Sequence, residues 1–337
     1  MRILAVTNML PSAERPSKGT FVEQQVKGLT DAGIAVEVLL IDRVGLGPAT
    51  YAKTVGVVRS RVVQVRPDLV HVMYGGVMAF LVTRATRFCP TVVAFCGTDL
   101  LGAARGPFAF RLRRAAGVFA SHEAARRADG IVVKSQNLRQ ALPKGIDPSR
   151  VRIIPNGIDL GRFRPLDRLE CRRKLGWSPD VFHVLFPTSD SGLRVKRMPL
   201  AEAAVALLNR MGIRSQMHGL PGVPHDEVPI WLNAADVLLL TSSHEGSPNI
   251  VKEALGCNRP VVSVDVGDVG ERIRGIEGCF LAEPTSSDLA DKLARVHDGL
   301  RIVNGRAKMQ DMSLEKVTMR LLELYDAMLA RWRKPAG

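Results

Sequence analysis

Short apolar segments alternate with longer amphipathic segments along the whole chain, and this alternation restricts the possible folds more than any other feature. The apolar segments are residues 2–7, 36–41, 68–73, 91–96 and 130–135 in the first half, and 182–188, 214–219, 236–242 and 260–266 in the second. Strands that are apolar throughout and are separated by helices predict parallel sheets covered by helices on both faces.

The alternation occurs in two series, and a segment rich in turn residues and charge separates them at about residues 155–180. For a chain of 337 residues this predicts two doubly wound, Rossmann-like α/β domains facing across a cleft. We expect the first domain over residues 1–165 and the second over 166–312. The helical segment at 313–337 is expected to pack back toward the first domain.

Composition excludes several classes of protein. The chain is 46% hydrophobic and 24% charged, as in ordinary globular domains, and has no apolar run of about 18 residues that would span a membrane. The short apolar run after Met1 lacks the features of a signal peptide, so a cytoplasmic location is expected. The five cysteines have no zinc-site spacing, which predicts reduced thiols and no metal.

The formal net charge of +14 is concentrated in the first half. Residues 1–170 contain 25 Lys and Arg against 13 Asp and Glu, whereas the remainder contains 22 against 20. A one-sided basic field indicates an anionic partner such as phospholipid, nucleic acid or a phosphorylated acceptor. Solubility alone is the alternative explanation.

The stretch "HEGSPNIVKEALG" after the apolar segment "DVLLLTS" combines a helix start with two carboxylates. Ser247 is expected to cap a helix whose first turn contains Pro248, and the amides of Asn249 and Ile250 would then suit a pyrophosphate. Glu245, before the helix, and Glu253, inside it, are suited to accept hydrogen bonds from vicinal hydroxyls of a ribose or hexose. The alternative is two solvated surface acids beside an ordinary helix.

The segment from Val228 to Ile273 resembles the signature of the retaining, GT-B-fold glycosyltransferases of family 4, which carry an E-x7-E pair followed by a Gly-rich loop ending in Glu. Three further stretches are similar to marks of that family: "GTFVEQQVKGLTDAG", "FCGTDLLG" and "IIPNGIDLGRFRP". The resemblance covers nearly the whole chain and implies a GT-B fold.

The resemblance also implies roles for individual residues. Glu245 would bind hydroxyls of the donor sugar and Glu253 those of the ribose. Lys196, with Arg194 or Arg197, would stabilise the departing diphosphate, so no metal is expected. Gly19 would let its loop approach the diphosphate closely. The other implied substrate-binding positions are Thr20, Cys96, Gly97, Asp99, Ser247, Asn249, Ile250 and Asp268.

Three features depart from the family pattern. Cys96 stands where the family has a His, which removes an imidazole from the sugar site or leaves that contact to another group. Arg194 and Lys196 are closer together than the usual Arg and Lys. Asp268 occupies a glycine position of the Gly-rich loop, where it would reach a substrate or only close the turn.

Residues 105–127 interleave Arg with Phe, a pattern suited to an anionic membrane surface or simply to an Arg-decorated surface helix. No nucleic-acid motif accompanies it. We therefore expect a peripheral membrane enzyme that transfers a hexose from a nucleoside diphosphate sugar, such as a UDP or GDP sugar, to a glycan or lipid-linked acceptor in surface polysaccharide or glycolipid synthesis. The alternatives are a nucleotide-sugar 2-epimerase and a basic lipid-binding module without turnover.

Overall fold

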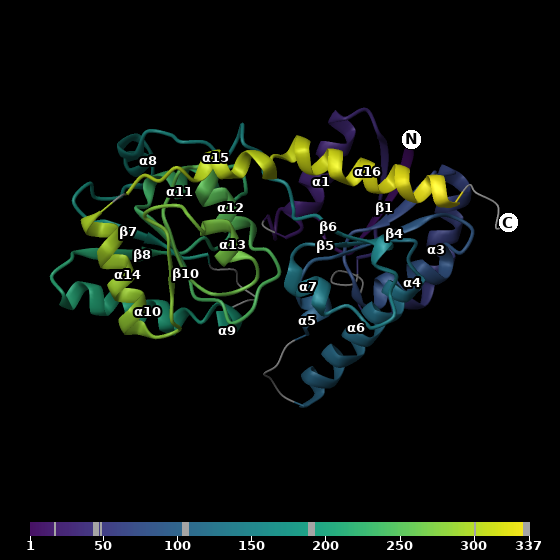
Figure 1. The fold of residues 1–337 in the computed structure, drawn as a ribbon, viewed down its shortest axis with the longest axis horizontal. Coiled ribbons are helices and arrows are strands. Elements are labelled where there is room, and N and C mark those ends of the chain that lie inside the picture. The colour runs from purple at the N-terminus through teal and green to yellow at the C-terminus, as the bar shows by residue number, and fades with distance from the viewer. Residues whose placement is uncertain are drawn as a thin grey trace. The chain divides into compact units, whose positions relative to one another are not determined.

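The computed structural model describes residues 1–16, 18–42, 47, 49–102, 108–187, 193–299 and 301–332, with the side chains of 108–110, 193 and 194 outside the description. The chain divides into two compact units (Figure 1). Unit 1 comprises Met1–Pro11, Lys18–Gly157 and Leu314–Gly337, and unit 2 comprises Ser12–Ser17 and Ile158–Ser313.

Unit 1 is built on a six-stranded parallel sheet with strand order β2-β1-β3-β4-β5-β6. Its strands are β1 (Arg2–Thr7), β2 (Ala35–Leu40), β3 (Leu69–Val72), β4 (Thr91–Phe95), β5 (Gly130–Val133) and β6 (Val151–Ile153). Its helices are α1 (Thr20–Asp31), α3 (Thr50–Val65), α4 (Gly76–Ala85), α5 (Thr98–Leu101), α6 (Phe108–Arg127), α7 (Gln136–Gln140) and α16 (Leu314–Trp332).

Alternate residues of the unit 1 strands pack against different helices. Val93, Phe95, Ile131 and Val133 point into a core shared with α3, α4 and α6. The intervening residues Val92, Ala94 and Val132 point into a second core, formed with Leu29 of α1 and the apolar side of α16. We call the side of the sheet that faces α1 and α16 the α1/α16 face. Burial on both faces explains why these strands read as continuous apolar runs.

Unit 2 has a five-stranded parallel sheet with strand order β11-β10-β9-β7-β8. Its strands are β7 (Phe182–Leu185), β8 (Ser215–His218), β9 (Val237–Leu240), β10 (Val261–Val264) and β11 (Phe280–Ala282). Its helices are α8 (Arg168–Leu175), α9 (Leu193–Lys196), α10 (Met198–Arg210), α11 (Val228–Ala234), α12 (Asn249–Gly256), α13 (Val269–Ile273), α14 (Ser286–Asp298) and α15 (Gly305–Met309).

The predicted fold class, two parallel-sheet α/β domains, is confirmed. The division between Gly157 and Ile158 lies before the expected boundary at residue 165, because Ile158, Leu160 and Phe163 are buried in the core of unit 2. The C-terminal helix α16 is part of unit 1, where Leu321 and Tyr325 contribute to the core on the α1/α16 face.

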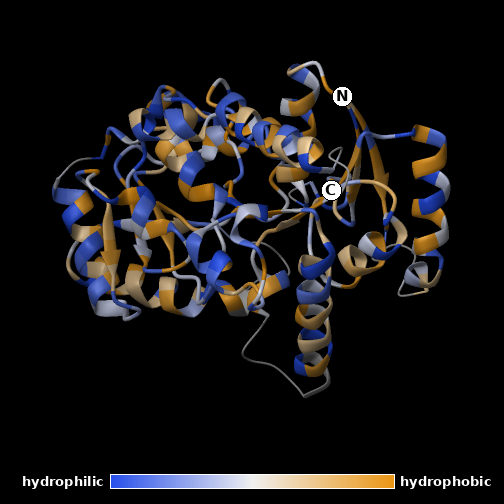
Figure 2. Ribbon diagram, turned by 45° about the vertical axis from the view of Figure 1, so that its right-hand side comes forward, coloured by the Kyte–Doolittle hydropathy of each residue, from blue (hydrophilic) through white to orange (hydrophobic). Residues whose placement is uncertain are grey.

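Helix α6 projects from unit 1 and carries both apolar and polar residues along its length (Figure 2). Leu112 and Phe119 are 62% and 66% exposed, and Arg111 and Arg113 are exposed beside them. Among the helices that the structure describes, none combines the length and the apolar character that a membrane crossing requires.

Candidate functional site

Lys196 and Glu245 form an ion pair at the carboxyl edge of the unit 2 sheet. Lys196 Nζ lies 2.5 Å from Glu245 Oε1, and each side chain is 19% exposed. Glu245 comes from the loop after β9, and Lys196 is the last residue of α9. The structure therefore brings together two predicted catalytic residues that are 49 positions apart in the sequence.

The backbone around Lys196 is held to the end of β9 by hydrogen bonds. Thr241 Oγ1 donates to Lys196 O at 2.5 Å, and Ser243 N donates to Val195 O at 2.8 Å. Arg197 adopts a left-handed conformation with φ 54°, and its guanidinium donates to the carbonyl oxygens of Thr241 and Ser242. Arg197 thus stabilises the backbone at the end of β9. Its contact with substrate stays a prediction.

The side chain of Arg194 lies outside the described residues, so its predicted role as the partner of Lys196 stays a prediction. Its backbone belongs to α9, the same short helix as Lys196.

Glu253 lies inside α12 and is almost completely buried, and His225 is its hydrogen-bonding partner. His225 Nε2 is 2.9 Å from Glu253 Oε1, and the two side chains are 13% and 9% exposed. The His225 ring also packs against Phe163, with ring centroids 5.2 Å apart. Glu253 is therefore a buried, hydrogen-bonded acid. The alternative interpretation, a solvated surface acid, does not apply to it. The sequence contained no signal for His225, because a histidine in a loop fits no spacing rule.

Helix α12 begins one residue later than predicted. Pro248 occupies the N-cap position with φ −68° and ψ 117°, and Asn249 is the first helical residue. Ser247 does not cap the helix, and its buried hydroxyl has no hydrogen-bond partner among the described residues. The prediction that Ser247 is the cap was wrong, because the proline backbone itself makes the turn into the helix. The first amides of α12, at Asn249 and Ile250, still lie at its N-terminus, as predicted.

The Gly-rich loop after β10 packs directly on the Glu245 loop. Gly267 has φ 62°, and a Cβ built on it would lie 2.8 Å from Gly246 O and 3.2 Å from Glu245 O. Only glycine allows both this conformation and this approach. The next residue, Asp268, is therefore fixed close to the loop that carries Glu245.

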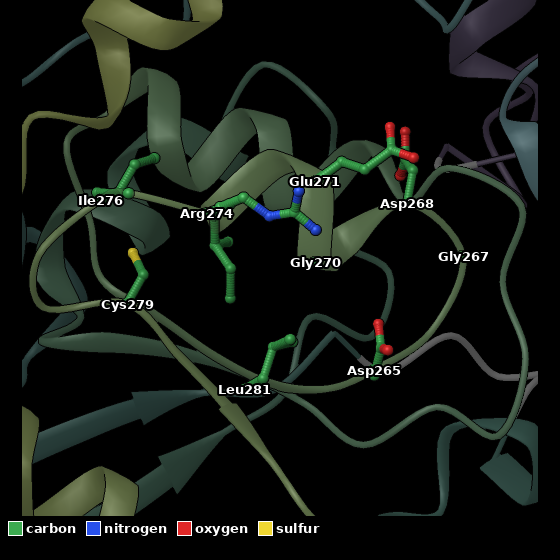
Figure 3. Close-up of a pocket in the computed structure, with 11 residues that line it drawn as sticks. Asp265, Gly267, Asp268, Gly270, Glu271, Arg274, Ile276, Cys279 and Leu281 are labelled. Carbon is green, nitrogen blue, oxygen red and sulfur yellow. The ribbon is translucent and has the colours of Figure 1, made fainter.

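Asp268 is 3% exposed and binds Arg272 through one carboxylate oxygen only. Arg272 Nε donates to Oδ2 at 2.9 Å, whereas the buried Oδ1 has no partner among the described residues. Asp268 lines a cavity of about 490 Å³ together with Asp265, Glu271 and Arg274 (Figure 3). Its placement in a cavity wall is compatible with the predicted substrate contact, which stays a prediction.

In unit 1, Gly19 precedes α1 with φ 78°, and a Cβ there would lie 2.7 Å from both the carbonyl carbon and the oxygen of Met9. The glycine is thus required for packing within unit 1, a reason that the sequence did not reveal. Thr20, its predicted neighbour in the site, is the first residue of α1.

Asp99 organises the loops that follow β3 and β4. Its carboxylate accepts hydrogen bonds from the backbone amides of Gly75 at 2.9 Å, Cys96 at 3.1 Å and Gly97 at 2.7 Å. Burial raises the pKa of this carboxyl, and the amide hydrogen bonds oppose that rise. Both oxygens are engaged, so the structure gives Asp99 a part in shaping the loops, and its predicted contact with substrate stays a prediction.

Cys96 is the first residue after β4. Burial raises the pKa of its thiol to about 12, so the group stays protonated at neutral pH. A protonated thiol is a weak hydrogen-bond donor and does not replace an imidazole. Gly97, buried beside it, contributes its amide to Asp99.

The fold is shared with solved glycosyltransferase structures. Sucrose-phosphate synthase from Thermosynechococcus elongatus superposes with a TM-score of 0.79, at 16% identity, over 98% of this chain and 100% of that one. Anabaena Alr3699/HepE in complex with UDP-glucose gives a TM-score of 0.70 at 20% identity, over 97% and 100% of the two chains. The GT-B fold expected from the sequence is therefore confirmed.

Two family descriptions match successive parts of the chain. Residues 19–162 match Glycosyltransferase Family 4, and residues 196–298 match Glycosyl transferases group 1. The first match lies mostly in unit 1 and the second lies in unit 2. Among curated proteins, this chain is similar to D-inositol 3-phosphate glycosyltransferase from Actinosynnema mirum, at 29% identity over 217 residues. That match covers 53% of this chain and 52% of the relative, so the chain spans about half the length of the curated relative.

Proposed function

We propose that this protein transfers a hexose from a nucleoside diphosphate sugar to a hydroxyl of a glycan or lipid-linked acceptor, with retention of the anomeric configuration. The observation that carries the proposal is the Lys196–Glu245 ion pair, which is largely buried at the carboxyl edge of the unit 2 sheet. Such edges are where doubly wound sheets bind nucleotides. The two family matches and the UDP-glucose complex of a structural neighbour support the same assignment.

Lys196 would stabilise the negative charge that develops on the departing nucleoside diphosphate. A fixed ammonium in a partly desolvated site performs this task without reorganisation at the moment of reaction. We therefore propose that Lys196, assisted by Arg194 and Arg197, does so without a required metal. Glu245 holds the ammonium in place and, in turn, would accept hydrogen bonds from hydroxyls of the donor sugar.

Glu253 would bind the ribose hydroxyls, and His225 would fix the orientation of its carboxylate through the contact at 2.9 Å. The N-terminal amides of α12, at Asn249 and Ile250, would face the sugar and phosphates. For the chemical step we propose internal return, in which the leaving phosphate accepts the proton of the acceptor hydroxyl on the same face. The protein then contributes mainly positioning and charge stabilisation.

The acceptor side is assigned to unit 1, which carries Gly19, Thr20, Cys96, Gly97 and Asp99. We also propose that α6 lies on an anionic membrane surface and brings the enzyme to a lipid-linked acceptor for surface polysaccharide or glycolipid synthesis. Support comes from Leu112 and Phe119, which are seven positions apart, therefore share a helix face, and are exposed beside arginines.

Calorimetric titration with a panel of UDP and GDP sugars tests the donor part of the proposal. We expect micromolar to millimolar binding of one donor, release of free nucleoside diphosphate when an acceptor is added, and an unchanged anomeric configuration in the product by NMR. Conversion of the donor sugar into its 2-epimer without acceptor would favour the epimerase instead. Failure of every donor to bind would remove the proposal.

A further inference from the structure

Lys134 is a buried lysine that forms no ion pair with any of the described residues. It directly follows β5 and is 1% exposed. None of the described residues forms a hydrogen bond or an ion pair with its ammonium. Burial lowers the pKa of Lys134, and Cys96 and Asp99 oppose that decrease. Since enclosing an uncompensated ammonium costs several kcal/mol, its retention at this position needs a reason.

The register of the sheet places Lys134 on the α1/α16 face. Phe95 of β4 pairs with Val133 of β5, so Cys96 and Lys134 come next on the two strands. Their side chains follow Ala94 and Val132, which belong to the core on that face. His71 of β3 lies on the same face, where its Nδ1 is 2.7 Å from the Tyr325 hydroxyl. Lys134 therefore belongs to a polar group at the carboxyl edge of the sheet.

The neighbouring groups form no hydrogen bond with Lys134. Both oxygens of Asp99 accept backbone amides, and the Cys96 thiol stays protonated because burial raises its pKa to about 12. His71 Nε2 is buried and has no partner among the described residues. Among the described residues, the Lys134 ammonium and His71 Nε2 on the same face thus have no hydrogen-bond partner.

We propose that Lys134 binds a phosphoryl group of the acceptor substrate at the carboxyl edge of the unit 1 sheet. This proposal rests on the proposed function, which assigns the acceptor substrate to unit 1. An ammonium offers three donors and a full charge, which suit a phosphate oxygen. The concentration of positive charge in residues 1–170 would attract the same class of ligand.

The test uses proteins that all carry Lys196→Met, so that phosphate has no ammonium at the donor site. Lys134→Met is compared with Lys144→Met, which removes the same charge from an exposed position of unit 1. We expect inorganic phosphate to raise the thermal midpoint of the parent and of Lys144→Met. In Lys134→Met the phosphate-induced shift should fall by more than about half. Without phosphate, Lys134→Met should be at least as stable as the parent, because a buried unpaired charge is gone.

An undiminished phosphate shift in Lys134→Met, or a strong loss of its stability without phosphate, would overturn the proposal. A second measurement does not depend on that variant folding. NMR of the lysine side-chain resonances of the parent protein should show that phosphate shifts the signal of Lys134 and leaves that of the exposed Lys144 unchanged. An unchanged Lys134 signal on addition of phosphate would overturn the proposal as well.

Two sources of the phosphoryl group are separated by vesicle sedimentation. The vesicles consist of phosphatidylcholine and phosphatidic acid. Weaker binding of Lys134→Met than of the parent to these vesicles indicates a lipid phosphate. Unchanged pelleting, together with a lost phosphate-induced shift of the thermal midpoint, indicates a soluble acceptor. Donor binding is measured separately by calorimetry with UDP and GDP sugars, in the chain with its native Lys196. Lys134→Met should leave donor affinity unchanged there, so failure of the donor assignment and failure of this one give different results.

Discussion

Lys196 Nζ lies 2.5 Å from Glu245 Oε1, and the same glutamate loop is in van der Waals contact with the loop of Gly267. Three segments of unit 2 that are distant in the sequence thus converge after β7, β9 and β10. Because parallel strands end at one edge, the loops that follow them are brought together without any sequence signal of their proximity.

Glu245→Gln is expected to lower kcat/KM for sugar transfer by about 10- to 100-fold, since a charged hydrogen-bond partner contributes about 1.5–3 kcal/mol. Steady-state kinetics with the identified donor measures the effect. Glu277→Gln, the same change at an exposed site of unit 2, is the control. Equal activity of the two variants would contradict the role of Glu245.

Glu253→Ala is expected to weaken binding of the nucleoside diphosphate sugar by at least about tenfold, because a buried carboxylate that meets hydroxyls loses a charge-assisted interaction. His225→Ala should have a smaller effect of the same sign, since it removes only the group that orients Glu253. Titration calorimetry of the two single variants and the double variant gives their coupling. Unaltered affinity in Glu253→Ala would exclude its contact with the ribose.

Gly267→Ala is expected to destabilise the protein by more than the strain of a left-handed residue alone, about 1–2 kcal/mol, because its Cβ meets Gly246 O at 2.8 Å. Gly275→Ala is a matched control: it has φ 74° but no atom within 4 Å of the built Cβ. Chemical denaturation compares the two variants. Similar free energies of unfolding would show that the contact with the Glu245 loop is unimportant for stability.

The stability of unit 1 is expected to fall as the pH decreases below 6.5. Burial and the nearby Lys134 lower the pKa of His71 to about 3, so the unfolded chain binds a proton there that the folded chain does not. Stability from this group is present above pH 6.5 and is lost toward pH 3, at about 1.4 kcal/mol per pH unit. Urea denaturation between pH 7 and 4.5 measures the slope.

A variant tests the assignment of this slope. His71→Asn should flatten the pH dependence, because the group whose pKa is lowered is gone. A slope that is the same in wild type and His71→Asn would assign the pH dependence to other groups.

Replacement of Arg111, Arg113 and Arg114 by Ser is expected to abolish co-sedimentation with anionic vesicles, because each arginine near such a surface contributes about 1 kcal/mol. Binding should also be weaker to neutral than to anionic vesicles in the wild type. Equal pelleting with both kinds of vesicle, or no change in the triple variant, would remove the membrane assignment of α6.

Much of the fold was predictable because burial on both faces of a parallel sheet leaves continuous apolar runs in the sequence, as in "VLLL" of β9 and "GIVV" of β5. The E-x7-E spacing likewise located Glu245 and Glu253 on either side of a helix start. Ser247 shows the limit of such local rules: a residue type that commonly caps helices precedes a proline that occupies the cap position itself.

The sequence alone determined the strand and helix alternation, the two-domain organisation and the positions of the acidic pair, because these depend on local periodicity and spacing. Only the tertiary structure decided that Lys196 pairs with Glu245 and that His225 binds Glu253. It also decided that Asp99 binds backbone amides and that Lys134 is enclosed without an ion-pair partner among the described residues. Those facts depend on which strand ends lie side by side and on how much water reaches each group, and chain packing fixes both.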